Sequence, residues 1–100
     1  MILGAIPKQP DETFPIFVDF VRRLATGETL STRTVTSKKL ADESDSTATL
    51  LQDLAIDGTK VLVRLKKAGA TGEDHRSKFH AVTNLGNELE DEVDIQIREY

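Results

Sequence analysis

The sequence predicts an all-β fold, an immunoglobulin-like antiparallel β-sandwich of six or seven short strands with an extended N-terminal arm. Segments rich in β-branched and aromatic residues recur at intervals of roughly 8–12 residues, and turn residues separate them. No segment has the pattern of a crossover helix, so a parallel sheet is not expected. A chain of 100 residues, 38% of them hydrophobic and 30% charged, can bury one modest core.

We divide the chain into an N-terminal arm, residues 1–12, and a single sandwich domain, residues 13–100. The arm carries two prolines and a glycine, and its polar run from Lys8 to Glu12 offers little to pack. Its apolar tip, residues 1–6, is unusual for a solvated tail. Two interpretations stay open: a disordered terminus, or a segment that docks on a neighbouring subunit.

Residues 14–21 predict the first strand, because apolar residues share one face at period two. These residues are Phe14, Ile16, Val18 and Phe20. A turn at residues 24–27 leads to residues 29–36, whose many threonines favour a second strand. The polar residues 38–47 lack periodicity and predict a loop.

Residues 48–56 are ambiguous. The leucines at 50, 51 and 54 fit helical spacing, and Ser46 or Thr47 could cap a short helix. A strand over the same residues needs one local irregularity. We favour the strand because the neighbouring segments are all strand-like.

Three more strands follow. Asp57-Gly58 is a hairpin signal that leads into a strand at residues 60–66. After a small-residue loop, residues 75–83 predict a strand, and Asn84 to Asn87 form a turn. The last strand has one dry face. Its expected inward residues are Leu89, Val93, Ile95 and Ile97, and the inward residues of the preceding strand are His75, Ser77, Phe79, Ala81 and Thr83.

Composition narrows the function. The chain has 13 basic and 17 acidic residues, a net charge of −4, which argues against a nucleic-acid partner. It has no cysteine for a disulfide or a thiolate site. The apolar start is broken by Pro7 and Lys8 before it could form a signal sequence or membrane span. We therefore expect a soluble protein made in a cytoplasm, with no membrane partner.

The residues do not assemble a catalytic or metal site. His75 and His80 are five residues apart on one strand, so their side chains should leave opposite faces, with His75 packed and His80 solvated. Serines lack a nucleophile-elbow motif, and the acidic run at residues 88–94 lacks the order of a calcium loop. We predict no enzyme activity, no metal and no cofactor.

The order of residues resembles a known family. Phe17-Val18-Asp19-Phe20, then Leu24 and Thr26-Gly27-Glu28-Thr29-Leu30, resemble the opening of small tailed-bacteriophage proteins described as fibre-tail adaptors. Leu65, Gly69, Gly72 and His75 resemble its Leu-x-x-Gly-x-x-Gly-x-x-Tyr-x-Val segment. Asn84-Leu85-Gly86, Glu90 and residues 93–97 resemble its closing hairpin and strand. The sequence departs from the family where Phe20 and Val21 stand in place of a Trp, and His75 in place of a Tyr.

The resemblance covers residues 11–100 and implies a structural virion protein of the neck or tail. Such a protein would bind a connector or tail ring as a homo-oligomeric ring and present a surface to fibres or collar components. It would reside in the virion, and in the host cytoplasm during assembly. Candidate assembly contacts are the arm residues Met1, Ile2, Leu3 and Ile6, and the outward charged residues Arg76, Lys78, Glu90 and Glu92. Deleting residues 1–10 should leave a folded domain that fails to incorporate.

The alternative is an immunoglobulin-like recognition module that binds carbohydrate or a cell surface. Such sites usually stack sugars on exposed Trp or Tyr, and this chain has no Trp and a single Tyr at its end. The composition therefore favours the structural role.

Overall fold

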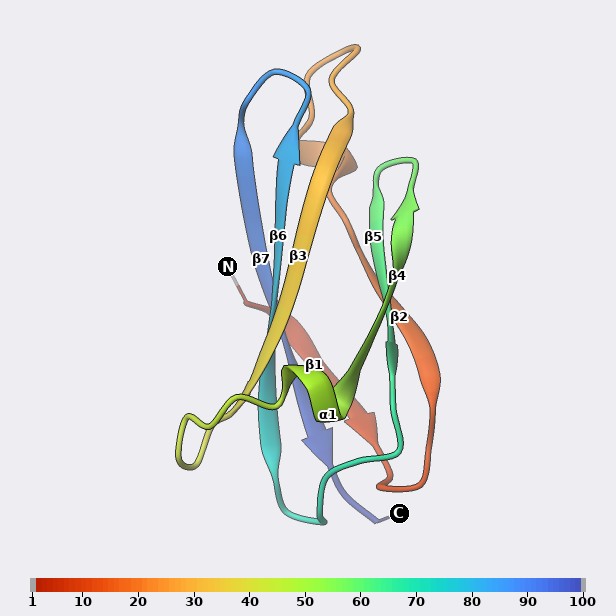
Figure 1. Ribbon diagram of the computed structural model, residues 1–100, viewed down its shortest axis with the longest axis vertical. Helices are drawn as coiled ribbons and strands as arrows, with labels where there is room; N and C mark the ends of the chain where they lie inside the picture. Colours follow the sequence, from red (N-terminus) through yellow and green to blue (C-terminus); the bar gives the residue numbers. More distant parts are fainter. Residues whose placement is uncertain (1, 100) are drawn as a thin grey trace.

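Two β-sheets pack face to face in the computed structural model, which describes residues 2–99 and, for Ile2, only the backbone (Figure 1). The larger sheet has the strand order β1-β7-β6-β3, and the smaller sheet β2-β5-β4. The strands are β1 (Ile2–Lys8), β2 (Phe14–Asp19), β3 (Leu30–Lys39), β4 (Leu51–Asp57), β5 (Lys60–Leu65), β6 (Asp74–Thr83) and β7 (Glu88–Ile97). The predicted all-β sandwich is confirmed, and its immunoglobulin-like character stays a prediction.

The core lies between the two sheets and follows the predicted alternation. All five residues expected on the inner face of β6, from His75 to Thr83, are buried, and Phe79 at its centre is 0% exposed. On β2, Ile16 and Val18 are buried in the same way, and so is Phe20 directly after the strand. Alternate residues of a strand point to opposite faces, so burying one face leaves the other for solvent or partners.

One inward position of β7 is charged. Asp91 lies between Leu89 and Val93 on the inner face and is 3% exposed. Arg23, at the end of the short helix η1 (Val21–Arg23), donates to Asp91 Oδ1 from Nη1 at 2.7 Å. The ion pair replaces the water that the carboxylate loses on burial.

The N-terminal segment differs from the expected arm outside the sandwich. Ile2–Lys8 form β1 at the edge of the larger sheet, parallel to β7, with a register shift between Ile2 and Ala5. Ile6 packs against the core and Lys8 is 0% exposed. The sequence pattern does not identify Lys8 as a core residue, because lysine side chains are usually exposed. Pro7, which lacks an N–H, reads as a strand breaker but is tolerated at a sheet edge.

The buried Lys8 ammonium is held by backbone oxygens. Its Nζ donates to the carbonyls of Gln9, Pro10 and Ala68 at 3.0, 3.3 and 3.4 Å. Burial lowers the pKa of Lys8, because the charged form loses water. The bond to the Ala68 carbonyl ties β1 to the loop after β5.

Residues 48–56 contain part of a helical turn and a strand, the two alternatives for this segment. Helix α1 (Thr47–Leu50) makes one turn, and β4 then runs with a register shift between Asp53 and Ala55. The predicted strand and its irregularity are thus present from Leu51 on. The helical turn lets two adjacent residues, Leu50 and Leu51, both face the core, which the alternation of a strand forbids.

Replacing Phe79 tests the core. Phe79→Ala is expected to lower the free energy of unfolding by about 3–5 kcal/mol, because it empties the centre of the sandwich. Phe17→Ala, at a residue that is 55% exposed, is the control and should cost less than about 1 kcal/mol. Urea unfolding of both variants gives the comparison, and similar losses would contradict the assigned core.

Truncation tests the position of β1. Deleting residues 1–10 should lower Tm, because it removes Lys8 and uncovers the edge of β7, in contrast to the expectation from sequence. Deleting residues 1–4 should have a smaller effect, since the regular pairing with β7 begins at Ala5. Thermal unfolding measures both, and an unchanged Tm for the longer deletion would place β1 outside the fold.

Candidate assembly surface

The outer face of the larger sheet carries a ladder of charged side chains. The register of β6 and β7 sets Arg76 opposite Asp94, Lys78 opposite Glu92, and His80 opposite Glu90. β6 therefore contributes mainly bases and β7 mainly carboxylates. We call this set the charged ladder, and it contains all four of the predicted charged contacts, Arg76, Lys78, Glu90 and Glu92.

The ladder is tightly paired at one end and loosely paired at the other. Arg76 donates two hydrogen bonds to Asp94, from Nε to Oδ1 at 2.7 Å and from Nη2 to Oδ2 at 3.1 Å. The hydrogen bond with Asp94 raises the pKa of Arg76. Lys78 Nζ lies 3.2 Å from Glu90 Oε1, with both side chains about half exposed. Exposed pairs of this kind contribute little stability, so Lys78 and Glu90 are available to a partner.

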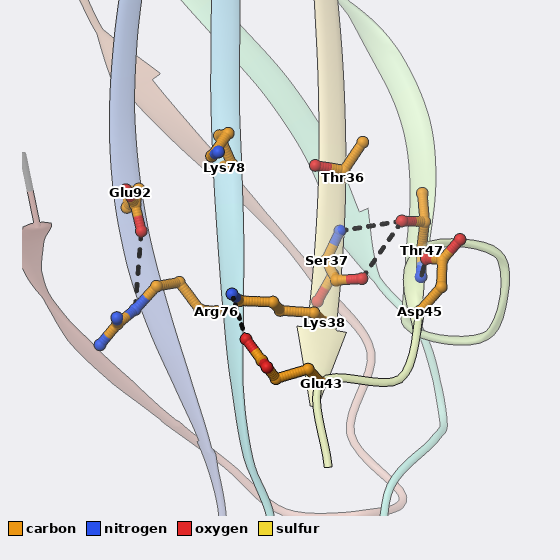
Figure 2. A pocket seen from close by; sticks show the side chains of 9 residues that line it. All are labelled: Thr36, Ser37, Lys38, Glu43, Asp45, Thr47, Arg76, Lys78 and Glu92. Atoms are coloured by element: carbon orange, nitrogen blue, oxygen red, sulfur yellow. Dashed lines mark hydrogen bonds and ion pairs between the residues drawn. The ribbon is translucent and has the colours of Figure 1, made fainter. Parts of the chain in front are cut away.

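A shallow depression of about 490 Å³ lies beside the ladder (Figure 2). It runs from Glu92 and Arg76 across Lys78 to the end of β3 and the loop that follows. Lys38 and Glu43 close its lower side with an ion pair of 3.3 Å. The lining is polar and of both charges, which suits a charged protein surface rather than an apolar ligand.

The outer face of the smaller sheet is different. Its middle row is apolar and consists of Phe17, Leu62 and Ala55, which are opposite one another on β2, β5 and β4. Phe17 is 55% exposed, and the ammonium of Lys60 lies 4.7 Å from the centre of its ring. We call this set the apolar row. Sequence reasoning assigned the other face of β2 to the core and missed the exposed ring.

The predicted arm contacts are only partly described. Met1 lies outside the described residues, and so does the side chain of Ile2. Leu3 is 48% exposed, whereas Ile6 faces inward and packs against the core. Among the described side chains of the arm, Leu3 is thus open to a partner and Ile6 is not.

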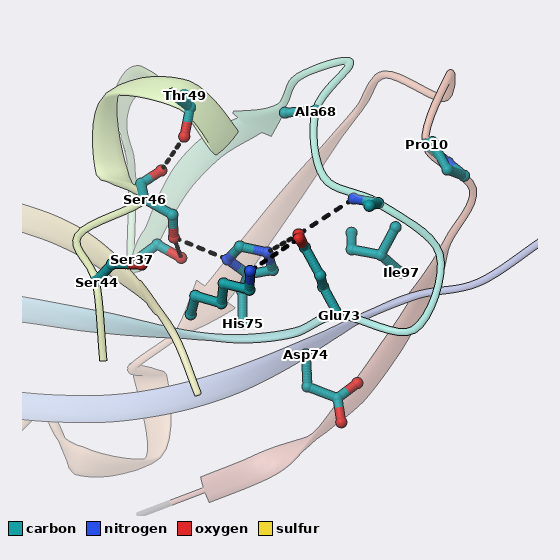
Figure 3. A network of polar contacts seen from close by, with 12 residues as sticks. Pro10, Ser37, Ser44, Ser46, Thr49, Ala68, Glu73, Asp74, His75 and Ile97 are labelled. Carbon is teal, nitrogen blue, oxygen red and sulfur yellow. Dashed lines mark hydrogen bonds and ion pairs between the residues drawn. The ribbon is translucent and has the colours of Figure 1, made fainter. Parts of the chain in front are cut away.

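A buried polar network surrounds His75 (Figure 3). Its Nδ1 lies 2.9 Å from Ser46 Oγ, and its Nε2 lies 3.1 Å from Glu73 Oε1. Ser46 is in turn bonded to the hydroxyl of Ser37 at 3.0 Å. His75 is packed and His80 lies on the opposite face at the ladder, as predicted. Ser46 and Glu73 come from separate loops, and no local pattern predicts that they meet at this ring.

The network has the connectivity of a Ser-His-acid triad, but its geometry serves structure. Ser46 is only 6% exposed, so its oxygen is not presented to a substrate. Glu73 also accepts the Ala70 N–H and pairs with Lys39 at 3.1 Å. The hydrogen bond from His75, followed by that from Ala70, lowers the pKa of Glu73 to about 2. The network thus fastens two loops to the end of the sandwich.

Within residues 2–99, no group of three or more acidic or histidine side chains could hold a metal ion. Nor does the described part of the chain contain a helix long and apolar enough to cross a membrane.

A known protein family matches most of the chain. A family model described as podophage GP4 fiber-tail adaptor protein gp77 matches residues 8–96. The chain belongs to this family. It is therefore a phage structural adaptor protein, a component of the virion that binds other phage structural proteins such as tail fibres. No curated protein matches the chain.

The family match contains the charged ladder and begins at the last residue of β1. Four predicted contacts, from Arg76 to Glu92, thus lie within the part of the adaptor that the family model covers. The arm residues Met1, Ile2, Leu3 and Ile6 precede it. This favours the ladder over the arm as the candidate assembly surface.

The adaptor's Gly-Glu-Thr-Leu segment has a structural role. Glu28 is 7% exposed, and its Oε2 accepts hydrogen bonds from Thr83 at 2.6 Å and from Asn87 at 2.8 Å. Its Oε1 accepts the Ala25 N–H at 2.9 Å. These bonds, that of Thr83 first, lower the pKa of Glu28. Two of the three segments that carry the resemblance, around Gly27 and around Gly86, are thereby joined.

The pKa of Glu73 predicts an acid-sensitive fold. The folded-state pKa of about 2 lies below the ordinary value of 4.5, so ionised Glu73 stabilises the fold fully above about pH 5, and this stabilisation is lost as pH falls toward 2. Glu73→Gln, which cannot titrate, should lose less stability over that window than the natural chain. Urea unfolding at a series of pH values measures this, with the exposed Glu99→Gln as the control. Parallel curves for all three proteins would contradict the assignment.

Proposed function

We propose that this adaptor acts at the neck or tail of the phage particle, where it joins the connector or tail ring to fibres or collar components. Copies of the chain form a homo-oligomeric ring around the particle axis. They fold in the host cytoplasm and are added to the particle during assembly. The observation that carries the proposal is the chemical difference between the two outer faces of the sandwich.

A closed ring needs two different surfaces on every subunit, because each copy contacts its neighbours through a heterologous interface. The charged ladder and the apolar row lie on opposite outer faces, one on each sheet. A further surface must remain for the fibre. A sandwich meets this demand since its core uses only the inner faces, and its outer faces and edges remain free.

The charged ladder suits a contact that forms during assembly. Lys78 and Glu90 are paired with each other in the free chain, so neither is left as an isolated charge. An incoming charged surface exchanges these weak pairs for new ones at small cost, and complementary charge selects the partner and the register. Arg76 stays paired with Asp94 and fixes one end of the ladder.

The copy number in purified particles tests the proposal directly. Quantitative mass spectrometry on density-purified phage should give a small-integer ratio of this chain to the portal protein, at or above one. Absence of the chain from particles, with abundant protein in the lysate, would overturn the assignment to the neck or tail.

A charge reversal tests the surface. Lys78→Glu should leave the fold intact, because the side chain is 52% exposed, and should reduce the copies per particle several-fold. Lys67→Glu is the matched control, since it makes the same change in charge at an exposed residue beyond β5. Circular dichroism confirms folding of both variants. Equal incorporation of the two would remove the charged ladder from the contact.

A further inference from the structure

β3 is an edge strand of the larger sheet. Some of the backbone N–H and C=O groups on its open side have no hydrogen-bond partner among the described residues. At its lower end the edge is covered: Ser37 N–H donates to Thr47 Oγ1 at 2.9 Å, and Ser37 C=O accepts the Ser46 N–H at 2.9 Å. Backbone groups alternate in direction along a strand, so those of Val35 and Arg33 point to the same open side. Within residues 2–99 these groups make no hydrogen bond on that side.

A groove of about 500 Å³ runs along this open edge. It lies between β3 and β4, the edge strands of the two sheets, which neighbour each other along one side of the sandwich (Figure 1). Its apolar lining comes from both sheets and from α1, and consists of Val35, Ala48, Leu51 and Val63. An unpaired strand edge beside an apolar groove is the arrangement that accepts an added strand.

The side chain of Arg33 also has a donor without an acceptor beside the groove. Its Nη2 donates to Asp53 Oδ2 at 3.1 Å and to the Leu54 carbonyl at 3.4 Å, which anchors the side chain across the groove. Its Nε is buried and has no acceptor among the described residues. Buried donors are almost always paired, so this one calls for an oxygen from outside the chain.

The opposite edge of the same sheet is less suited to strand addition, because a proline interrupts its row of donors. On β1, the Lys8 carbonyl accepts the Arg98 N–H and therefore points toward β7. By alternation the backbone of Pro7 points to the open side, where it has no N–H to offer. The larger sheet thus has one edge with a proline, a residue by which natural proteins limit edge pairing, and one edge without it.

We propose that the edge of β3 binds an extended segment of a different virion protein as an added β-strand. The segment alternates apolar residues, which enter the groove, with polar residues, and supplies a carbonyl or carboxylate oxygen to Arg33 Nε. A second copy of this chain is the poorer occupant. The β1 edge of such a copy lacks a donor at Pro7. The inference rests on the proposed adaptor role.

Cross-linking in the particle tests the identity of the occupant. The chain has no cysteine, so Thr34→Cys introduces a unique thiol beside the groove, and Gln52→Cys introduces one on the outer face of the smaller sheet as control. Purified particles that carry each variant are treated with a benzophenone maleimide and irradiated. A cross-link from position 34, and not from 52, to a different virion protein is expected. A cross-link to another copy of the chain, or none, would overturn the proposal.

Blocking the groove tests the site itself. Ala48→Trp fills the groove from α1, whereas Ala55→Trp places the same side chain on the outer face of β4. Both residues are exposed, so both variants should fold. Only Ala48→Trp should abolish the cross-link when combined with Thr34→Cys. Retention of the cross-link would overturn the proposal.

Hydrogen exchange separates this inference from the adaptor role. The amides of Arg33 and Val35, which point away from β6 in the open segment of β3, should exchange rapidly in the free chain and slowly in particles. If the chain is in the particles but this segment exchanges at the free rate, the adaptor role stands and strand addition is wrong. If the chain is absent from particles, both fail.

Discussion

Burial of two inner sheet faces against each other is the constraint on which the rest of this molecule depends. Phe79, Val61 and Ile95 are inaccessible to solvent, and they come from both sheets. Because a strand turns alternate residues to opposite sides, this burial fixes which residues of every strand face outward. The charged ladder and the apolar row are thus consequences of the core, since a slip of one residue would exchange the inner and outer sets.

Polar groups buried at the ends of the sandwich hold the loops in place. Glu28 joins the turn at Gly27 to the hairpin of β6 and β7, and His75 joins the loops that contain Ser46 and Glu73. Lys8 fixes the first strand to the loop at Ala68. A buried polar group is costly when left unpaired, so each of these clusters specifies one loop arrangement and no other. The acid sensitivity expected from Glu73 follows from this anchoring.

An adaptor must hold one partner while it presents itself to another, and this fold separates these tasks in space. The ladder offers exchangeable charge on one face, the apolar row offers an exposed ring on the other, and the edge of β3 offers unpaired backbone. A contact with the face of a sheet depends on its side chains. A contact with the edge of a sheet depends mainly on backbone hydrogen bonds. The proposed ring and the proposed strand addition therefore use different parts of the chain and do not compete.

The sequence by itself determined the alternation of β2, β6 and β7, the hairpin at Asp57-Gly58 and the opposite faces of His75 and His80, because these depend only on neighbours along the chain. Tertiary structure decided what depends on distant residues. Lys8 became a core residue only because three carbonyls, one of them 60 positions away, surround its ammonium. The pairing of β1 with β7, the meeting of Ser46 with Glu73 around one imidazole, and the open edge of β3 have the same origin. Local pattern tells which way a side chain points, and only the folded chain determines what it meets there.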